Sequence, residues 1–95
     1  MTEPEACRVD VWLWRARLFK TRSLSARFVD EGRVRLIRGQ QESRLDKASR
    51  TVRVGDGLVM AIEGRIIAVR IESVGDRRGP ASEARMLYSE LDSAG

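Results

Sequence analysis

Residues 8–34 read RVDVWLWRARLFKTRSLSARFVDEGRV, and the spacing of their apolar side chains predicts two helices joined by a short turn. One broad face of the first helix, over residues 9–19, carries Val9, Trp12, Leu13, Ala16 and Phe19. A second face, roughly opposite, carries Val11, Trp14 and Leu18. A helix that is apolar on two sides packs between two neighbours, so we expect this helix to lie in the core.

The second helix is expected over residues 24–31. Ser23 is a good N-cap residue, and Gly32 favours a helix end because it tolerates the left-handed backbone found there. Leu24, Phe28 and Val29 are expected to face inward. Because the connection between the two helices is so short, they must pack against each other.

Beyond the second helix, β-branched and aliphatic residues predict a small sheet. Strand-like segments lie at residues 34–37, 51–54, 58–62 and 66–74. Val52 and Val54 are expected to point inward. The first two segments are separated by a polar stretch, residues 38–48, with a turn near Gly39. Residues 55–57 (Gly-Asp-Gly) and 63–64 (Glu-Gly) are typical turn sequences, the second of them closing a hairpin.

A last helix is predicted over residues 81–91, with Pro80 at its first position. One stripe of this helix carries Ala84, Leu87, Tyr88 and Leu91, and the second face of the first helix is its expected partner. The predicted fold class is therefore α+β: a two-helix αα turn packed on a small, mostly antiparallel sheet, with a C-terminal helix on the first helix. We expect one domain over residues 8–91, between flexible ends at 1–7 and 92–95.

Charge is distributed unevenly along the chain. Its 95 residues include 18 Lys plus Arg and 14 Asp plus Glu, for a net charge of +4, and 16 of the basic residues are Arg. Residues 8–53 alone carry 13 basic and five acidic side chains. The guanidinium fork binds phosphate bidentately, so this basic half points to a polyanionic partner. A charged surface that serves only solubility is the simpler alternative.

The basic residues gather around the predicted start of the second helix, where free N–H groups and the helix dipole favour an anion. Between residues 15 and 27 there are five basic side chains and no acidic one. The candidate phosphate site comprises Arg8, Arg15, Lys20, Thr21, Arg22, Ser23, Arg27, Arg33 and Arg35. Asp10 is expected to orient Arg8. Two ordinary amphipathic helices with solvated Arg side chains would give the same pattern.

Composition disfavours several functional classes. The chain has no His and a single Cys, Cys7, which argues against His-based catalysis, a metal centre and an internal disulfide. We therefore expect no enzyme, no cofactor and no small-molecule substrate. A secretory signal and a membrane-spanning segment are both missing from the sequence, so we expect a cytoplasmic protein. The five aromatic residues all fall in predicted helices, which favours recognition by shape and phosphate over base stacking on a sheet.

Three segments of the chain, residues 8–14, 19–24 and 31–35, resemble the S-four RNA-binding domain. Residues 52–56 are similar to the Val-x-x-Gly-Asp strand and turn of that family. Residues 77–84, followed by Leu87-Tyr88, resemble the final helix of its ribosome-associated heat-shock protein fifteen branch. Where the family usually has an Asn-Gly turn after the strand that follows Gly32, this chain has residues 36–39, in which Arg38 could replace the Asn electrostatically.

The resemblance implies that RNA binds across the helix pair and the adjacent strand. Carried over by position, the RNA face would include Arg8, Asp10, Lys20, Thr21, Arg22, Ser23, Arg27, Gly32, Arg33, Val34 and Arg35. The implied partner is ribosomal RNA of the large subunit, and the implied role is to help rescue stalled subunits. A monomer is the simplest expectation for the oligomeric state. Two alternatives stay open: an RNA-binding accessory module of an RNA-modifying or tRNA enzyme system, and a protein-interaction module with a basic face.

Overall fold

A computed structural model of the chain, which describes residues 5–91, contains short helices and strands. In chain order the elements are β1 (Ala6–Arg8), α1 (Val9–Arg15), α2 (Arg22–Asp30), β2 (Val34–Arg38), β3 (Gln41–Leu45), β4 (Thr51–Arg53), β5 (Gly57–Ile62), β6 (Arg65–Ile71), α3 (Ala81–Ala84), the 3-10 helix η1 (Arg85–Leu87) and β7 (Tyr88–Glu90). The flexible ends expected at 1–7 and 92–95 lie mostly outside the described residues, although Ala6 and Cys7 belong to β1.

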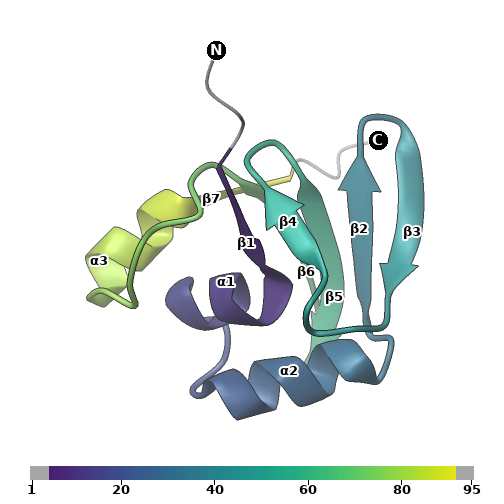
Figure 1. Cartoon of the computed structure of the whole chain (residues 1–95), viewed down its shortest axis with the longest axis horizontal. Coiled ribbons are helices and arrows are strands. Elements are labelled where there is room, and N and C mark those ends of the chain that lie inside the picture. Colours follow the sequence, from purple (N-terminus) through teal and green to yellow (C-terminus); the bar gives the residue numbers. More distant parts are fainter. Residues whose placement is uncertain (1–4, 92–95) are drawn as a thin grey trace.

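The strands form two antiparallel sheets. Five of them make one sheet in the order β3-β2-β5-β6-β7, and β1 pairs separately with β4. Figure 1 shows α1 and α2 packed side by side at the end of the sheet where β2 begins, with α3 beyond α1. This arrangement confirms the predicted α+β class, with a two-helix turn on a small antiparallel sheet.

The core forms where the helix pair meets the sheet. Val9, Trp12 and Leu13 of α1 are fully buried, as the first apolar face predicts. The strands contribute Val34, Leu36, Leu45, Val52, Leu58, Met60, Val69 and Ile71. The indole Nε1 of Trp12 donates to the carbonyl oxygen of Ser73 at 2.9 Å, so the ring is buried with its polar atom satisfied.

The first helix ends at Arg15, and its predicted extension to Phe19 is wrong. Arg17 has a left-handed backbone with φ of 61°. Its N–H donates to the carbonyl oxygen of Trp14 at 3.0 Å, and the N–H of Leu18 donates to that of Leu13 at 3.1 Å, which is the pattern of a Schellman motif. Glycine usually occupies this left-handed position, and because Arg stands there instead, the apolar pattern did not reveal the helix end.

The second helix begins at Arg22 rather than at residue 24. Its N-cap is Thr21 and not Ser23, because the Thr21 Oγ1 accepts a hydrogen bond from the N–H of Leu24 at 3.1 Å. Its C-terminal end is as predicted, since Gly32 has φ of +74° and its N–H donates to the carbonyl oxygen of Val29 at 2.8 Å.

The buried face of α2 consists of Ser25, Phe28 and Val29. Ser25 is fully buried, and its hydroxyl donates to the main-chain oxygen of Asp10 at 2.8 Å, which brings α1 close to this face. Leu24 lies at the edge of the face and is 46% exposed, so the prediction that it faces inward is wrong.

Two features of the strands were not predicted correctly. β3 (Gln41–Leu45) lies within the stretch predicted as polar connection, and only Leu45 of it is buried, so its side chains show no apolar alternation. Val52 is buried as predicted, but Val54 follows the end of β4 and is 40% exposed. The turn at Gly39, with φ of +64°, is confirmed.

The β5–β6 hairpin is confirmed. Ile62 pairs with Arg65, so its loop has two residues, Glu63 and Gly64, with φ of 52° and 79°. Two positive φ values in a two-residue loop define a type I′ turn, which matches the right-handed twist of the strands.

The predicted helix over 81–91 is wrong beyond Ala84. After η1, Tyr88–Glu90 pairs with β6 as an edge strand, which no simple apolar stripe would indicate. The C-terminal segment packs on the first helix through a strand residue, because the Tyr88 ring meets Trp12 edge-on with centroids 6.3 Å apart. No helix within residues 5–91 is long and apolar enough to cross a membrane.

Candidate nucleic-acid interface

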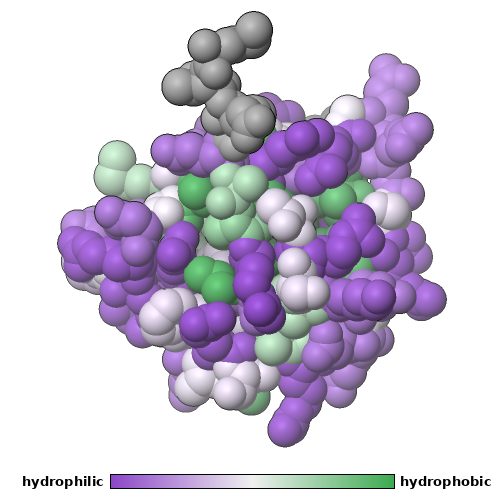
Figure 2. Space-filling view, in the orientation of Figure 1, coloured by the Kyte–Doolittle hydropathy of each residue, from purple (hydrophilic) through white to green (hydrophobic). Residues whose placement is uncertain are grey.

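Exposed basic side chains surround α2 and the elements next to it. We define the basic arc as Arg8, Lys20, Arg22, Arg27, Arg33 and Arg35, all of them exposed. They come from the end of β1, the connection before α2, α2 itself, the turn after α2 and the start of β2. Figure 2 shows that hydrophilic residues cover most of the side of the molecule where β2, β3 and the end of α2 lie. The arc is therefore an open cationic surface.

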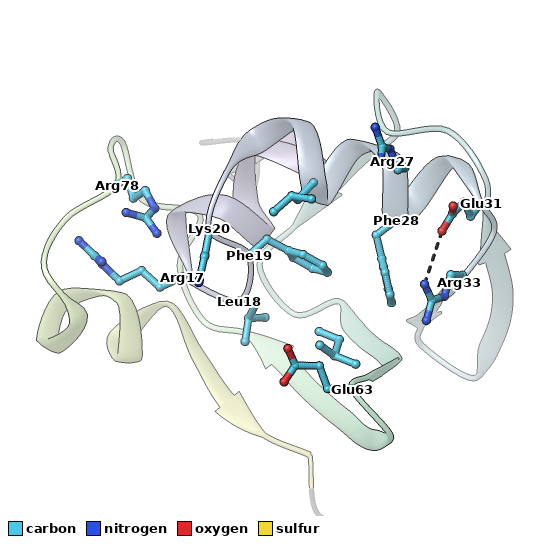
Figure 3. A pocket seen from close by; sticks show the side chains of 12 residues that line it. Arg17, Leu18, Phe19, Lys20, Arg27, Phe28, Glu31, Arg33, Glu63 and Arg78 are labelled. Carbon is cyan, nitrogen blue, oxygen red and sulfur yellow. Dashed lines mark hydrogen bonds and ion pairs between the residues drawn. The ribbon is translucent and has the colours of Figure 1, made fainter.

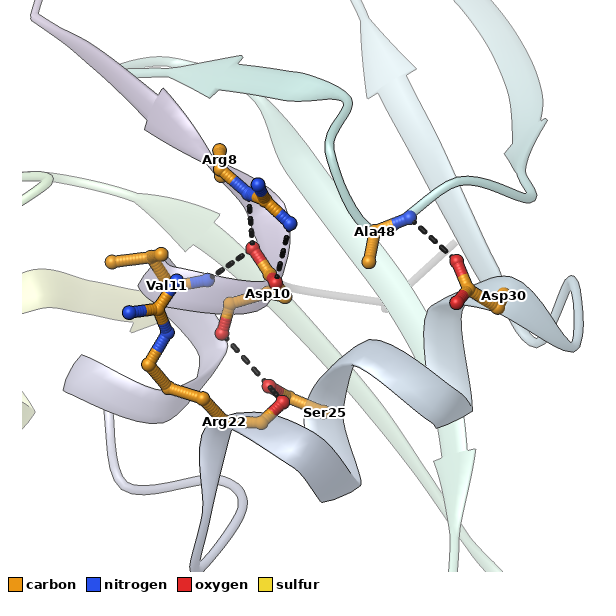
Figure 4. A network of polar contacts seen from close by, with 7 residues as sticks. All are labelled: Arg8, Asp10, Val11, Arg22, Ser25, Asp30 and Ala48. Atoms are coloured by element: carbon orange, nitrogen blue, oxygen red, sulfur yellow. Dashed lines mark hydrogen bonds and ion pairs between the residues drawn. The ribbon is translucent and has the colours of Figure 1, made fainter.

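Arg8 is held in place by Asp10, as the sequence predicts. Its Nε and Nη2 donate to the two carboxylate oxygens of Asp10, both at 3.0 Å, and Asp10 is 3% exposed (Figure 4). The same carboxylate accepts the N–H of Val11 at 2.8 Å. These hydrogen bonds and the negative charge of Asp10 raise the pKa of Arg8. Asp10 therefore positions the guanidinium and, being buried, does not itself face a ligand.

Three cations of the arc, Lys20, Arg22 and Arg27, form no ion pair with any residue from 5 to 91. Arg33 and Arg35 form exposed pairs with Glu31 (3.5 Å) and Glu42 (3.3 Å). Exposed pairs of this kind contribute at most about 1 kcal/mol, so a phosphate can displace the carboxylate. The guanidinium carbon of Arg33 also lies 4.3 Å from the centre of the Phe28 ring.

The structure places four predicted site residues differently. The Val34 side chain is fully buried, and Gly32 serves the turn after α2. Arg15 points to the loop after β6, where its Nη1 donates to the carbonyl oxygens of Val74 (3.2 Å) and Gly75 (2.9 Å). Thr21 and Ser23 lie beside the arc and are both exposed, although the Thr21 hydroxyl caps α2.

Arg38, the fourth, ends β2 and so lies a strand length away from α2. Its guanidinium is bidentate on buried Asp56, with N···O distances of 2.9 and 2.8 Å. The hydrogen bonds to Asp56 raise the pKa of Arg38, while burial lowers it. Asp56 also accepts the N–H of Arg53 at 2.9 Å, so the pair locks the turn before β5. Arg38 has a structural role and does not join the arc.

Arg44 was not among the predicted site residues, because the polar sequence of β3 gives no strand pattern. Arg44 is exposed and lies directly opposite Arg35 in the β2–β3 ladder. Its side chain packs over Gly32, where an added Cβ would lie 3.4 Å from Arg44 Cδ. Like charges opposite each other destabilise a sheet, so this pair favours an anion between or beside the two guanidinium groups. Among residues 5–91 no cluster of His, Cys, Asp and Glu is placed to hold a metal ion.

The sequence matches a domain family and several bacterial proteins. The S4 domain model matches residues 7–36. The heat shock protein 15 homolog of Haemophilus influenzae is 34% identical over 94 residues, which cover 99% of this chain and 67% of that protein. Heat shock protein 15 of Escherichia coli K12 is 35% identical over 83 residues, which cover 87% of this chain and 59% of that protein. The chain thus spans about three fifths to two thirds of these relatives.

A solved structure shares the fold. The trimeric structure of Vibrio cholerae heat shock protein 15 superposes with a TM-score of 0.80 at 34% identity. The match covers 95% of this chain and 86% of that one. The predicted resemblance is confirmed by this likeness and by the curated relatives.

Proposed function

This chain belongs to the heat shock protein 15 family, and from that premise we propose that it is a non-catalytic protein that binds structured RNA through the basic arc. The observation that carries the proposal is the arc itself. Three of its cations form no ion pair within the described part of the chain, and a buried carboxylate holds Arg8 in one orientation. A guanidinium that is already oriented loses little side-chain entropy when it binds a phosphate. Shape and phosphate contacts are the usual means by which proteins recognise paired RNA.

The finer proposal is that the RNA is ribosomal RNA of the large subunit, and that binding serves the rescue or recycling of stalled subunits in the cytoplasm. The family resemblance supports this choice, and so does the preference of an oriented Arg surface for a folded RNA. A single chain carries the whole arc, so we further propose that one monomer is sufficient for binding. Sedimentation velocity of the protein with one RNA equivalent tests this stoichiometry.

The salt dependence of binding tests the phosphate contacts. If the arc neutralises about four to six phosphates, log K falls against log salt with a slope of roughly −3 to −5. Arg22→Gln together with Arg27→Gln is expected to weaken binding and to flatten the slope by roughly 1 to 2. The matched control is Arg65→Gln with Arg70→Gln, which removes two exposed Arg side chains from β6, outside the arc. Equal effects of the two double variants would reject the arc as the binding surface.

The nature of the RNA needs a separate experiment. Crosslinking in cells, followed by sequencing of the bound RNA, is expected to recover mainly large-subunit ribosomal RNA. Crosslinks dominated by messenger RNA or tRNA contradict the ribosomal proposal. Co-sedimentation with ribosomal subunits that survives nuclease treatment would instead indicate a protein partner for the basic face.

A further inference from the structure

An open groove lies between the α1–α2 connection, α2 and the tip of the β5–β6 hairpin (Figure 3). Its volume is about 780 Å³, and its floor is apolar, formed by Leu18, Phe19, Leu24, Phe28 and Ile62. The Phe19 and Phe28 rings lie 5.0 Å apart, and Leu24 beside them is 46% exposed. An apolar floor open to solvent in such a charged chain indicates a binding surface.

The edge of the groove is cationic. Lys20, Arg27 and Arg33 line it and also belong to the basic arc, so the two surfaces are continuous. Arg17 and Arg78 line it as well, and hydrogen bonds to main-chain oxygens hold both side chains in place. Arg17 Nε donates to the carbonyl oxygen of Gly79 at 2.7 Å, and Arg78 Nε donates to the carbonyl oxygen of Trp14 at 3.1 Å. Glu31 and Glu63 also line the groove, so its edge carries five basic and two acidic side chains, and the excess positive charge suits the phosphates that flank a bound nucleotide.

Backbone strain gathers at the same groove. Within residues 5–91, two residues other than glycine have positive φ, Arg17 (61°) and Glu63 (52°), and both line the groove. Glu63 takes the first position of a type I′ turn, where Asn, Asp and Gly are preferred. Its carboxylate makes no hydrogen bond or ion pair with the described residues. The type I′ turn accounts for the positive φ of Glu63 but does not require a carboxylate there, so this side chain is available to a ligand in the groove.

We propose that this groove receives one unpaired nucleotide of the RNA held by the basic arc, with its base on the apolar floor and its exocyclic amino group donating to Glu63. The inference rests on the proposed function and adds base recognition to it. Unpaired bases are splayed out and read at their edges in this way, and carboxylates accept hydrogen bonds from base amino groups. Lys20 and Arg27 would hold the flanking phosphates. A carboxylate in this place repels a phosphate or an acidic peptide, so the chemistry favours a base.

Three RNA hairpins with the same stem test the proposal: one fully paired, one with a single bulged adenosine and one with a single bulged uridine, which has no amino group. The protein is expected to bind the adenosine bulge about tenfold more tightly than the paired stem, within the range of stacking one base on a protein, with the uridine bulge between them. Glu63→Asn creates an Asn-Gly turn that favours the hairpin, and Leu24→Ala shortens the floor. Glu63→Asn is expected to lower the affinity for the adenosine bulge to that for the uridine bulge, and Leu24→Ala to lower both bulges towards the paired stem. Both variants should leave binding of the paired stem within about twofold.

Two controls separate this inference from the proposed function. Met86→Ala removes an apolar side chain that is 75% exposed and lies outside the groove, and it should keep the adenosine preference. Arg35→Gln, in the arc but outside the groove, should weaken all three RNAs alike. Two results would contradict base binding in the groove: equal affinity of the unaltered protein for the three RNA hairpins, or an adenosine preference that survives in both groove variants. Neither result would contradict RNA binding by the basic arc. A uniform rise in affinity in Glu63→Asn would also contradict base binding in the groove, because Glu63 would then act only by repulsion. If no hairpin binds at all, the proposed function itself fails.

Discussion

Arg8 and Asp10 face each other side-on, with Nε 3.0 Å from Oδ1 and Nη2 3.0 Å from Oδ2. The two partners differ in exposure, since the Arg8 side chain is 50% exposed and that of Asp10 is 4%. The Asp10 carboxylate is therefore part of the folded interior, whereas the Arg8 guanidinium is accessible to a ligand. Removing one or the other should have different consequences for stability and binding.

Asp10→Ala is expected to lower the free energy of unfolding by about 1–3 kcal/mol, because the N–H of Val11 loses its acceptor and Arg8 its anchor. The same variant should weaken RNA binding, since Arg8 becomes free to rotate. Arg8→Gln should weaken RNA binding with a smaller loss of stability. Chemical denaturation and RNA titration of both variants measure the two effects, and a fully stable Asp10→Ala protein would show that this carboxylate is not structural.

Thr21→Ala is expected to destabilise the protein by about 1 kcal/mol, because it removes the N-cap of α2. Ser23→Ala is the matched control: Ser23 is exposed in the first turn, and its loss should cost no more than a few tenths of a kcal/mol. Thermal unfolding of the two variants distinguishes them. A larger effect at Ser23 would mean that the helix begins where the sequence alone predicted.

Asp56→Ala is expected to destabilise the protein by about 2 kcal/mol, since Arg38 and the N–H of Arg53 both lose their acceptor. RNA affinity, measured well below the unfolding temperature, should change by less than about twofold, because this pair lies outside the arc. A clear loss of RNA affinity in the folded variant would indicate that Arg38 contributes to RNA binding.

Arg44→Gln is expected to weaken RNA binding while leaving stability unchanged or raising it by a few tenths of a kcal/mol, because it relieves the like-charge pair with Arg35. Thermal unfolding followed by circular dichroism measures the stability, and RNA titration measures the affinity. Arg65→Gln, on an exposed position of β6, controls for the loss of one charge. If Arg44→Gln destabilises the free protein, the two guanidinium groups do not repel each other in this geometry.

Burial raises the pKa of the Cys7 thiol above its ordinary value, while the charge of Arg15 lowers it in part and the charge of Asp10 adds to the rise. The thiolate is the reactive form, so alkylation of the native protein should be slow at pH 8 and should reach half its maximal rate at a higher pH than in the denatured protein. The thiol ionises more readily in the unfolded state, so its contribution to stability holds below about pH 9 and declines as pH rises through the native pKa. Iodoacetamide rates across this pH range check the sign of the shift.

Elements that bury a regular apolar pattern could be predicted from the sequence. Elements whose ends or pairing depend on hydrogen bonds could not. The face of Val9, Trp12 and Leu13 and the β5–β6 hairpin follow from periodicity and turn residues. The end of α1 depends on Arg17 in a position that usually requires glycine, and β3 is a strand with almost no buried side chain. Neither leaves an apolar pattern.

For a similar reason, only some residues of the candidate site could be assigned correctly from the sequence. The arc was predictable because cations without acidic neighbours are visible as composition, and the pairing of Arg8 with Asp10 follows from their closeness in sequence. Arg15 and Arg38 looked equivalent to the other arginines until their distant acceptors were known, the carbonyl oxygens after β6 and the carboxylate of Asp56. Arg44 became visible only with the β2–β3 register.

Hydrogen bonds between residues 12–17 and residues 73–79 can form only late in the synthesis of the chain. Trp12, Arg15 and Arg17 donate to carbonyl oxygens about 60 residues later, and Arg78 donates back to Trp14. A nascent chain that has exposed only its first two helices lacks these partners. Arg17 and Arg78 at the edge of the groove are therefore held in place only after most of the chain has been synthesised, and contacts so far apart in sequence are expected to slow folding.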